Sequence, residues 1–134
     1  MSYPFEELLG ENFNGNAPAT AEQIAVAERS LGKSLPDDFR AFLQATNGGE
    51  GFIGENYIML WTAEELGELN EAYPVKECAP GLLLFGSDGG GEGYAFDMRT
   101  SPPPIVMVPF VGMSLTYANP VAPTFVAFLK NLGD

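Results

Sequence analysis

Glycine and proline recur at short intervals along the whole of this sequence. Sixteen glycines and eleven prolines among 134 residues make up one residue in five, whereas about one in eight is usual in globular proteins. Both residue types interrupt helices and strands, so the segments between them are short. The pattern therefore favours short elements joined by many turns over a helical bundle, and the chain length fits one domain.

Two capping boxes mark the starts of helices. They are Thr20–Gln23 and Thr62–Glu65. In each, the Gln or Glu side chain three residues after the threonine can accept a hydrogen bond from the backbone N–H of that threonine. Apolar residues then recur at helical spacing in both segments. The sequence therefore predicts one helix that ends at Gly32 and another that runs through about Ala72 and is stopped by Pro74.

Three further helices are predicted from local patterns. Pro4–Leu9 carries its apolar residues on one side, and Thr124–Leu132 repeats phenylalanine and leucine at helical spacing. Pro36 suits the first position of a helix that runs to Asn47-Gly48-Gly49. The segment Gly10–Pro18 is rich in glycine, asparagine and proline, and it is predicted to be a loop.

The remaining apolar runs are short and predict strands. They are Phe52-Ile53, Tyr57–Leu60, Leu82–Phe85, Tyr94–Asp97, Ile105–Val108 and Ser114–Tyr117, with a glycine-dense turn at Gly86–Gly93. Their close spacing is typical of hairpins. We therefore expect an α+β fold: a single, mostly antiparallel sheet of about five or six strands backed by N-terminal helices and a C-terminal helix.

The chain is strongly acidic. Eighteen Asp and Glu against six Lys and Arg give a formal net charge of −12. Nucleic acids and anionic membranes are bound largely through clustered cations, and the six basic residues here are scattered, so neither is an expected partner. Opposite charge speeds the encounter of two proteins, and like charge rejects wrong partners. A basic protein is therefore the expected partner.

Missing residue types exclude whole reaction classes. The sequence has no histidine, which excludes Ser-His-Asp and Cys-His catalysis and histidine-ligated metals, and its one cysteine, Cys78, excludes an intrachain disulfide and a cysteine zinc site. We therefore expect no catalytic residue, no metal and no other cofactor. The first residues do not resemble a secretory signal, and Pro109 interrupts Ile105–Val111, the longest apolar candidate for a membrane span. The expected location is the cytoplasm.

The glycine-rich segment Gly86–Asp97 is the first candidate site. The carboxylates of Asp88, Glu92 and Asp97 suit a hard cation, and glycine N–H groups suit a phosphate. However, the spacing is not that of an EF-hand, no Gly-Lys-Ser/Thr sequence follows, and three acids repel a phosphate. A hairpin turn whose acids meet water or a protein partner is the favoured interpretation.

The helix that begins at Thr62 carries the second candidate site. Glu64, Glu68 and Glu71 fall within about 60° of one another around the helix axis. Neighbouring like charges are mildly unfavourable and suit a basic partner, although a solvated helix face explains them as well. Tyr57 and Trp61, near a strand end, are either core residues with a polar tip or an aromatic platform for a ligand.

The order of these signals resembles one known family. The first half carries Glu28-x-x-Leu31-Gly32-x-x-Leu35-Pro36-x-Asp38-Phe39-x-x-Phe42-Leu43-x-x-x-Asn47-Gly48-Gly49, which resembles the opening of the SUKH superfamily, the Smi/Knr-like domains. Three later stretches, Leu60–Leu66, Phe85–Asp97 and Phe125–Leu132, look like that family's strand-to-helix step, central hairpin and closing helix. The resemblance covers about Ala19–Leu132.

This resemblance implies one domain over residues 1–134, with residues 1–18 as an arm packed on it. It also implies a non-enzymatic immunity protein that binds and neutralises a bacterial toxin domain, often a nuclease. Two alternatives stay open: a regulatory scaffold with a non-toxin partner, and a carboxylate- or metal-dependent hydrolase. The residues expected at the protein-binding surface are Glu64, Glu68, Glu71, Asp88, Glu92, Tyr57 and Trp61.

Overall fold

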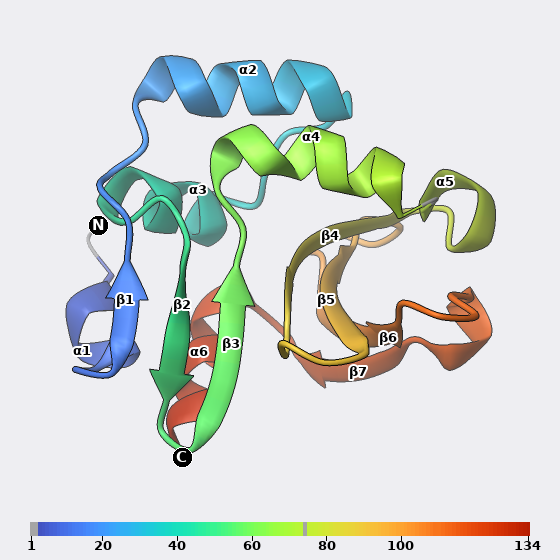
Figure 1. The fold of residues 1–134 in the computed structure, drawn as a ribbon. Helices are drawn as coiled ribbons and strands as arrows, with labels where there is room; N and C mark the ends of the chain where they lie inside the picture. The colour runs from blue at the N-terminus through green and yellow to red at the C-terminus, as the bar shows by residue number, and fades with distance from the viewer. Residues whose placement is uncertain (1–2, 74) are drawn as a thin grey trace.

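One antiparallel sheet runs through the molecule, and each strand pairs with the strands next to it in the chain (Figure 1). The computed structural model describes residues 3–73 and 75–134, and within them the sheet has seven strands in the order β1 to β7. Their bounds are β1 Phe13–Gly15, β2 Gly49–Ile53, β3 Asn56–Leu60, β4 Leu82–Ser87, β5 Glu92–Asp97, β6 Ile105–Pro109 and β7 Asn119–Ala122. The predicted α+β class and antiparallel sheet are confirmed, with one or two strands more than expected.

Six α-helices and one short 3₁₀ helix accompany the sheet in the described part of the chain. They are α1 Phe5–Leu9, α2 Ala21–Leu31, α3 Asp37–Ala45, α4 Ala63–Ala72, α5 Val75–Cys78, η1 Leu115–Tyr117 and α6 Phe125–Gly133. Both predicted capping boxes are present, at the starts of α2 and α4. Gly32 ends α2 with a φ of 70°, while Pro74, which was expected to stop α4, lies outside the described residues.

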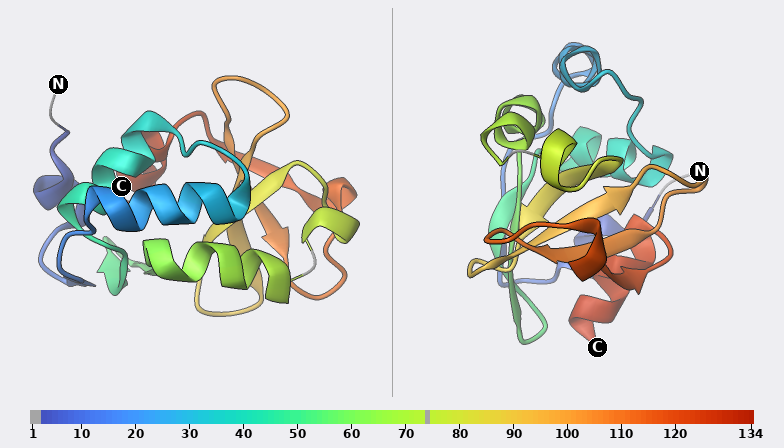
Figure 2. Two further views of the ribbon diagram at one scale, coloured as in Figure 1. Left: turned by 90° about the horizontal axis from the view of Figure 1, so that it is seen from above. Right: turned by 90° about the vertical axis from the view of Figure 1, so that its right-hand side faces the viewer.

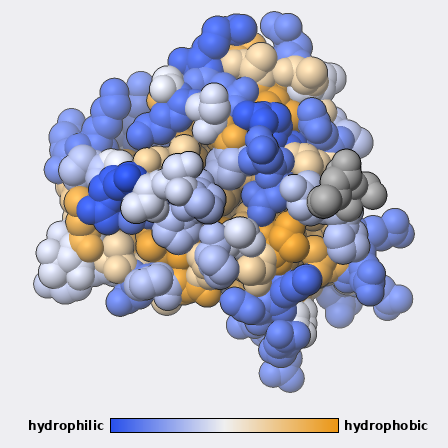
Figure 3. Space-filling view, turned by 180° about the vertical axis from the view of Figure 1, so that it is seen from behind, coloured by the Kyte–Doolittle hydropathy of each residue, from blue (hydrophilic) through white to orange (hydrophobic). Residues whose placement is uncertain are grey.

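The helices lie on two sides of the sheet. In Figure 1, α6 lies behind β2 and β3, and α2 and α4 lie side by side above the sheet. The view from above in Figure 2 shows α2 and α4 running side by side, with α3 on the other side of α2. Between α3, the sheet and α6 lies a core of phenylalanine rings with centroids 4.6–6.4 Å apart: Phe39, Phe42, Phe85, Phe96, Phe125 and Phe128. Seen from behind, small apolar patches alternate with hydrophilic side chains (Figure 3).

The polar residues of the first family motif hold these elements together. Glu28 Oε2 accepts from the backbone N–H of Leu35 (2.7 Å) and from Arg40 Nη2 (2.8 Å), which fixes the turn between α2 and α3. Although burial opposes it, these two hydrogen bonds and the Arg40 charge hold the pKa of the Glu28 carboxyl below its usual value. Asp38 Oδ2 accepts from the backbone N–H of Val126 (3.1 Å), so α3 caps the start of α6.

Asn47 joins the start of β2 to the start of α4. Its Oδ1 accepts from the backbone N–H of Ala63 (2.8 Å), and its Nδ2 donates to Glu64 Oε1 (2.9 Å). The Ala63 N–H lies in the first turn of α4 and has no acceptor within that helix. Glu28, Asp38 and Asn47, which belong to the motif of the family resemblance, therefore stabilise the fold. The candidate binding surface consists of other residues.

Three local predictions were wrong. Residues 13–15, expected in a loop, form β1, because glycine in β2 lets another backbone come close: a Cβ at Gly51 would lie 2.4 Å from Asn12 O. Ser114–Tyr117, expected as a strand, turns into η1, since Ser114 Oγ accepts from the backbone N–H of Thr116 (3.2 Å). The turn expected at residues 86–93 is shorter, because Ser87 pairs with Gly93 and extends β4 and β5.

Candidate protein-binding face

Alternation along β3 places Tyr57, Met59 and Trp61 on one side of the sheet. Strand pairing continues this side into a row across four strands, since Asn14 lies opposite Glu50, Glu50 opposite Met59, and Met59 opposite Ser87. The other side of β2 and β3 is buried, where Ile53 and Ile58 face the core. The row belongs to the side that faces away from α6, which is turned to the viewer in Figure 1.

This side of the sheet is hollowed into an open depression of about 640 Å³, which we call the concave face. Its floor is the cross-strand row, its upper wall is α4, and its far wall is formed by the β4–β5 turn and the residue that follows β6. The side chains that line it include Asn14, Glu50, Met59, Trp61, Glu65, Tyr73, Ser87 and Phe110.

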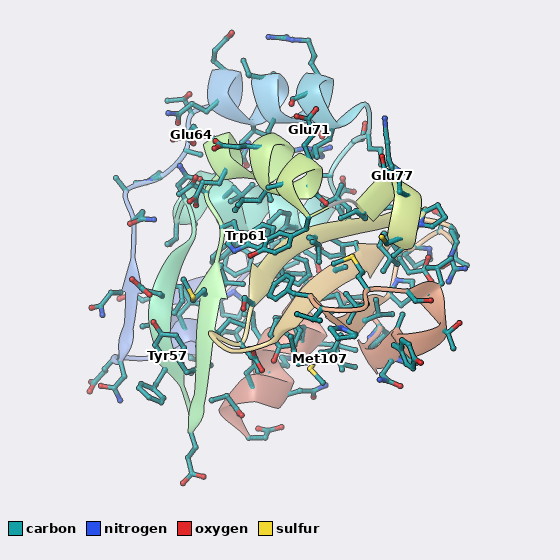
Figure 4. The ribbon with its side chains drawn as sticks, turned by 45° about the vertical axis from the view of Figure 1, so that its right-hand side comes forward. Tyr57, Trp61, Glu64, Glu71, Glu77 and Met107 are labelled. Atoms are coloured by element: carbon teal, nitrogen blue, oxygen red, sulfur yellow. The ribbon has the colours of Figure 1, made fainter. Side chains whose placement is uncertain are left out.

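Three aromatic rings from separate elements meet in the concave face. Trp61 follows β3, Tyr73 ends α4, and Phe110 follows β6. The Trp61 and Tyr73 ring centroids lie 6.3 Å apart at an interplanar angle of 11°, and those of Tyr73 and Phe110 lie 4.4 Å apart at 23°. Figure 4 shows Trp61 below α4, and it is only 7% exposed. The three rings thus form a nearly parallel aromatic row.

The charges around this row are all negative. Glu50 and Glu65 line the concave face, and no Lys or Arg does so among residues 3–73 and 75–134. Glu50 Oε2 accepts from the Tyr57 hydroxyl (2.5 Å), and this hydrogen bond raises the pKa of the Tyr57 phenol. Glu65 Oε1 accepts from the backbone N–H of Thr62 (3.0 Å), so the capping box also orients this carboxylate. The face therefore suits a cationic group.

The predicted acidic turn lies beside the concave face but is used partly for its own structure. Asp88 Oδ1 accepts from the backbone N–H groups of Gly90 (2.8 Å) and Glu92 (3.3 Å). Gly89 comes so near Tyr57 that an added Cβ would lie 2.7 Å from the ring. Burial, together with the Asp88 and Glu92 charges, raises the pKa of Tyr94. The sequence had placed Asp88 and Tyr57 on one surface, and the structure brings their segments together.

The predicted acidic stripe lies on a different surface. Glu64, Glu68 and Glu71 line a groove between α2 and α4, and Figure 4 shows Glu64 and Glu71 on the side of α4 next to α2. Val26, 49% exposed, lies in the same groove. In the part of the chain that the structure describes, none of the three carboxylates forms an ion pair. Of the seven predicted residues, Trp61 lines the concave face, and Glu64, Glu68 and Glu71 line the groove on the other side of α4. Tyr57, Asp88 and Glu92 line neither the depression nor the groove.

The three acids considered for a cation do not converge. Glu92 and Asp97 stand at opposite ends of β5, about 17 Å apart at the usual strand rise. Asp97 instead holds Arg99, with two oxygen–nitrogen distances of 2.8 Å, and these hydrogen bonds lower the pKa of the Asp97 carboxyl. Among the described residues, no group of three Asp, Glu or Cys side chains is placed to hold a metal ion.

Apart from Trp61, sequence reasoning named none of the charged or aromatic residues of the concave face, which are Glu50, Glu65, Tyr73 and Phe110. The period-two alternation of β2 and β3 was a usable signal for Glu50, because it faces the same side as Tyr57. Glu65 was recognised only as a capping residue, and both Glu65 and Tyr73 line the depression. Phe110 had no local signal, since only the sheet brings it to Tyr73.

The fold and this face define a class: a helix-backed antiparallel sheet with an acidic and aromatic face. The family model for the SMI1 / KNR4 family (SUKH-1) matches residues 18–131, so the chain belongs to that family. The family is commonly associated with immunity proteins and is typically non-catalytic. None of the helices in the described residues has the length and apolar character that crossing a membrane requires.

One curated protein is similar to part of the chain. The chain is 33% identical over 89 residues to "Uncharacterized protein YnaB" of Bacillus subtilis (strain 168). The aligned part covers 66% of this chain and 57% of the relative, so the chain spans little more than half of that protein's length.

Proposed function

We propose that this chain is an immunity protein that binds a basic toxin domain stoichiometrically and blocks it within the cytoplasm. The observation that carries the proposal is the composition of the concave face: two carboxylates, three aromatic rings and, among the described residues, no basic side chain. Aromatic anchors inside a polar rim are typical of the centre of a protein interface. Membership of a family commonly associated with immunity proteins supports the same role.

The mechanism has two steps. The net charge of −12 first attracts a basic partner from a distance, an effect that salt screens. The aromatic row then packs against the partner and loses its contact with water, while Glu50 and Glu65 form ion pairs with cationic side chains of the partner. A nuclease site is built to attract phosphate, so an acidic inhibitor is suited to occupy the same positive potential. The proposal assigns the acidic stripe, Asp88 and Glu92 to the first step.

In this proposal residues 1–134 act as one binding domain, and residues 1–18 are an arm on it. The ring of Phe5 in α1 lies 5.6 Å from that of Phe42 in α3, centroid to centroid, which supports the placement of the arm. Within this arm, α1 packs on the core, whereas β1 belongs to the sheet and brings Asn14 to the concave face, where the partner is expected to bind.

Co-expression tests the proposed function. Each basic protein encoded beside this gene is expressed with and without the full chain, and growth and binding by titration calorimetry are measured. We expect the chain to restore growth against one toxic neighbour and to bind it more weakly as salt rises. Binding to a non-toxic neighbour instead would support a regulatory scaffold, and binding that ignores salt would contradict the charge mechanism.

Matched variants locate the surface. Glu50→Gln with Glu65→Gln removes two charges from the concave face, and Glu6→Gln with Glu7→Gln removes two exposed charges from α1. Glutamine at residue 65 still accepts the capping hydrogen bond, so the fold is retained. We expect the first pair to weaken partner binding at least tenfold more than the second, and equal losses would contradict the assignment of the face.

A further inference from the structure

Trp61 presents a polar group that the fold leaves unused. The residue is 7% exposed and lines the concave face, yet its indole N–H forms no hydrogen bond within residues 3–73 and 75–134. No buried side-chain nitrogen among the described residues lacks a hydrogen-bond partner, so this N–H is open to the solvent in the concave face. It is therefore free to donate to a bound molecule, for example to a peptide carbonyl.

The surroundings of Trp61 specify a second feature of the bound molecule. Tyr73 stands nearly parallel to both Trp61 and Phe110, and all three residues line the depression. Glu65 uses only Oε1 in the capping box among the described residues, which leaves Oε2 for a ligand. Aromatic faces beside a carboxylate, with no basic side chain among the described lining residues, favour a planar cation.

A guanidinium group meets these demands better than an ammonium group. It is planar and stacks on aromatic rings, and its fork of N–H groups matches a carboxylate. Since a guanidinium has no acceptor, only another group of the same molecule, such as a peptide carbonyl, can accept from the Trp61 N–H. The occupant that satisfies both groups is an arginine within a peptide segment, and a free guanidinium satisfies only one.

We propose that the concave face is an arginine pocket, in which Trp61, Tyr73 and Phe110 receive a guanidinium that Glu65 pairs and Trp61 also holds the backbone of the arginine segment. The inference rests on the proposed function, because it names the side chain that anchors the basic partner. In this arrangement Glu50 is a flanking charge, already engaged by the Tyr57 hydroxyl.

The test uses the one tryptophan of the chain as reporter. The full-length, ¹⁵N-labelled protein is titrated with the peptide acetyl-Gly-Arg-Gly-amide, and the single indole N–H signal is followed by NMR. The probes for comparison replace arginine by lysine or by citrulline, which keeps the planar shape without the charge. We expect saturable shifts with arginine in the millimolar range, weaker binding of lysine by about threefold or more, and no saturable shift with citrulline.

Two matched variants assign the carboxylate. Glu65→Gln keeps the capping hydrogen bond but loses the charge, and it is expected to weaken the arginine peptide about three- to tenfold. Glu7→Gln, exposed on α1 and outside the concave face, makes the same change in net charge and is expected to leave the affinity within about 1.5-fold.

The proposal is overturned if the arginine peptide leaves the Trp61 signal unchanged, if citrulline shifts it equally, or if both variants weaken binding alike. Failure here is separable from failure of the proposed function. A toxin that still binds the concave face while the peptide does not removes only the arginine pocket. A pocket that binds the peptide while no neighbouring toxin is neutralised keeps the pocket and removes the immunity role.

Discussion

Replacing Asn47 with alanine tests whether the family motif supports the binding surface through the start of α4. The change removes the acceptor of the Ala63 N–H and the donor to Glu64, at 2.8 and 2.9 Å. A buried N–H without an acceptor costs about 1–3 kcal/mol, and loss of a helix cap about 1 kcal/mol. We therefore expect Asn47→Ala to lower the free energy of unfolding by about 2–3 kcal/mol.

Urea and thermal unfolding followed by circular dichroism measure this loss. For a domain of this size, it corresponds to a fall in melting temperature of roughly 6–15 °C. Asn14→Ala is the matched control, because Asn14 is exposed and its side chain forms no hydrogen bond in the described residues; it is expected to change the unfolding free energy by less than about 0.5 kcal/mol.

A charge swap makes the test stricter. Asn47→Asp keeps an acceptor for the Ala63 N–H but places a second carboxylate next to that of Glu64. Adding Glu64→Gln restores the side-chain hydrogen bond with its direction reversed, because the glutamine amide now donates to the carboxylate introduced by Asn47→Asp. The double variant is expected to recover about 1 kcal/mol of the free energy of unfolding. Our reasoning is refuted if Asn47→Ala unfolds within 0.5 kcal/mol of the wild type, or if Glu64→Gln does not improve Asn47→Asp.

The remaining predictions concern acid stability, backbone strain and one phenol. The folded pKa of Glu28 lies below its unfolded value of about 4.5, so its stabilisation is present above that pH and is lost as the pH falls through the folded pKa; in urea unfolding, Glu28→Gln is expected to show a shallower acid dependence. Gly48→Ala puts a Cβ 2.4 Å from a carbonyl oxygen at a φ of 72°, and it is expected to lower the free energy of unfolding, measured by thermal unfolding, by more than about 3 kcal/mol. Gly112→Ala has nearly the same φ, 73°, but its Cβ points into open space, so the expected loss is only about 1–2 kcal/mol. Equal losses would contradict the steric clash at Gly48. Glu50→Gln is expected to lower the pKa of Tyr57, measured by NMR of labelled tyrosine, and an unchanged value would show that the 2.5 Å hydrogen bond is not formed in solution.

Local signals predicted the helices better than the strands. The capping boxes at Thr20 and Thr62 located the starts of α2 and α4, because a cap depends on residues within one turn. By contrast, β1 depends on glycines almost forty residues away in β2, and β7 contains Pro120, a poor strand residue that the sheet accepts at its edge. Pairing with distant segments leaves no trace in a short window of sequence.

The candidate surface shows the same division. Tyr57 and Trp61 were predicted from their place near a strand end, and alternation puts them on one face. Spacing around the α4 axis correctly grouped Glu64, Glu68 and Glu71, but only the position of α2 shows that they line a different groove. Residues of each surface could therefore be predicted from the sequence. Which of them share a surface depends on the packing of α4, which separates the concave face from the groove.

Hydrogen exchange of the chain with and without its bound toxin domain tests the central claim most directly. The account predicts that new protection appears at the concave face, in β1, β3, the end of α4 and the segment at Phe110, while α1 and the back of the molecule are unchanged. Protection confined to the groove between α2 and α4, or to the back of the molecule, would contradict it.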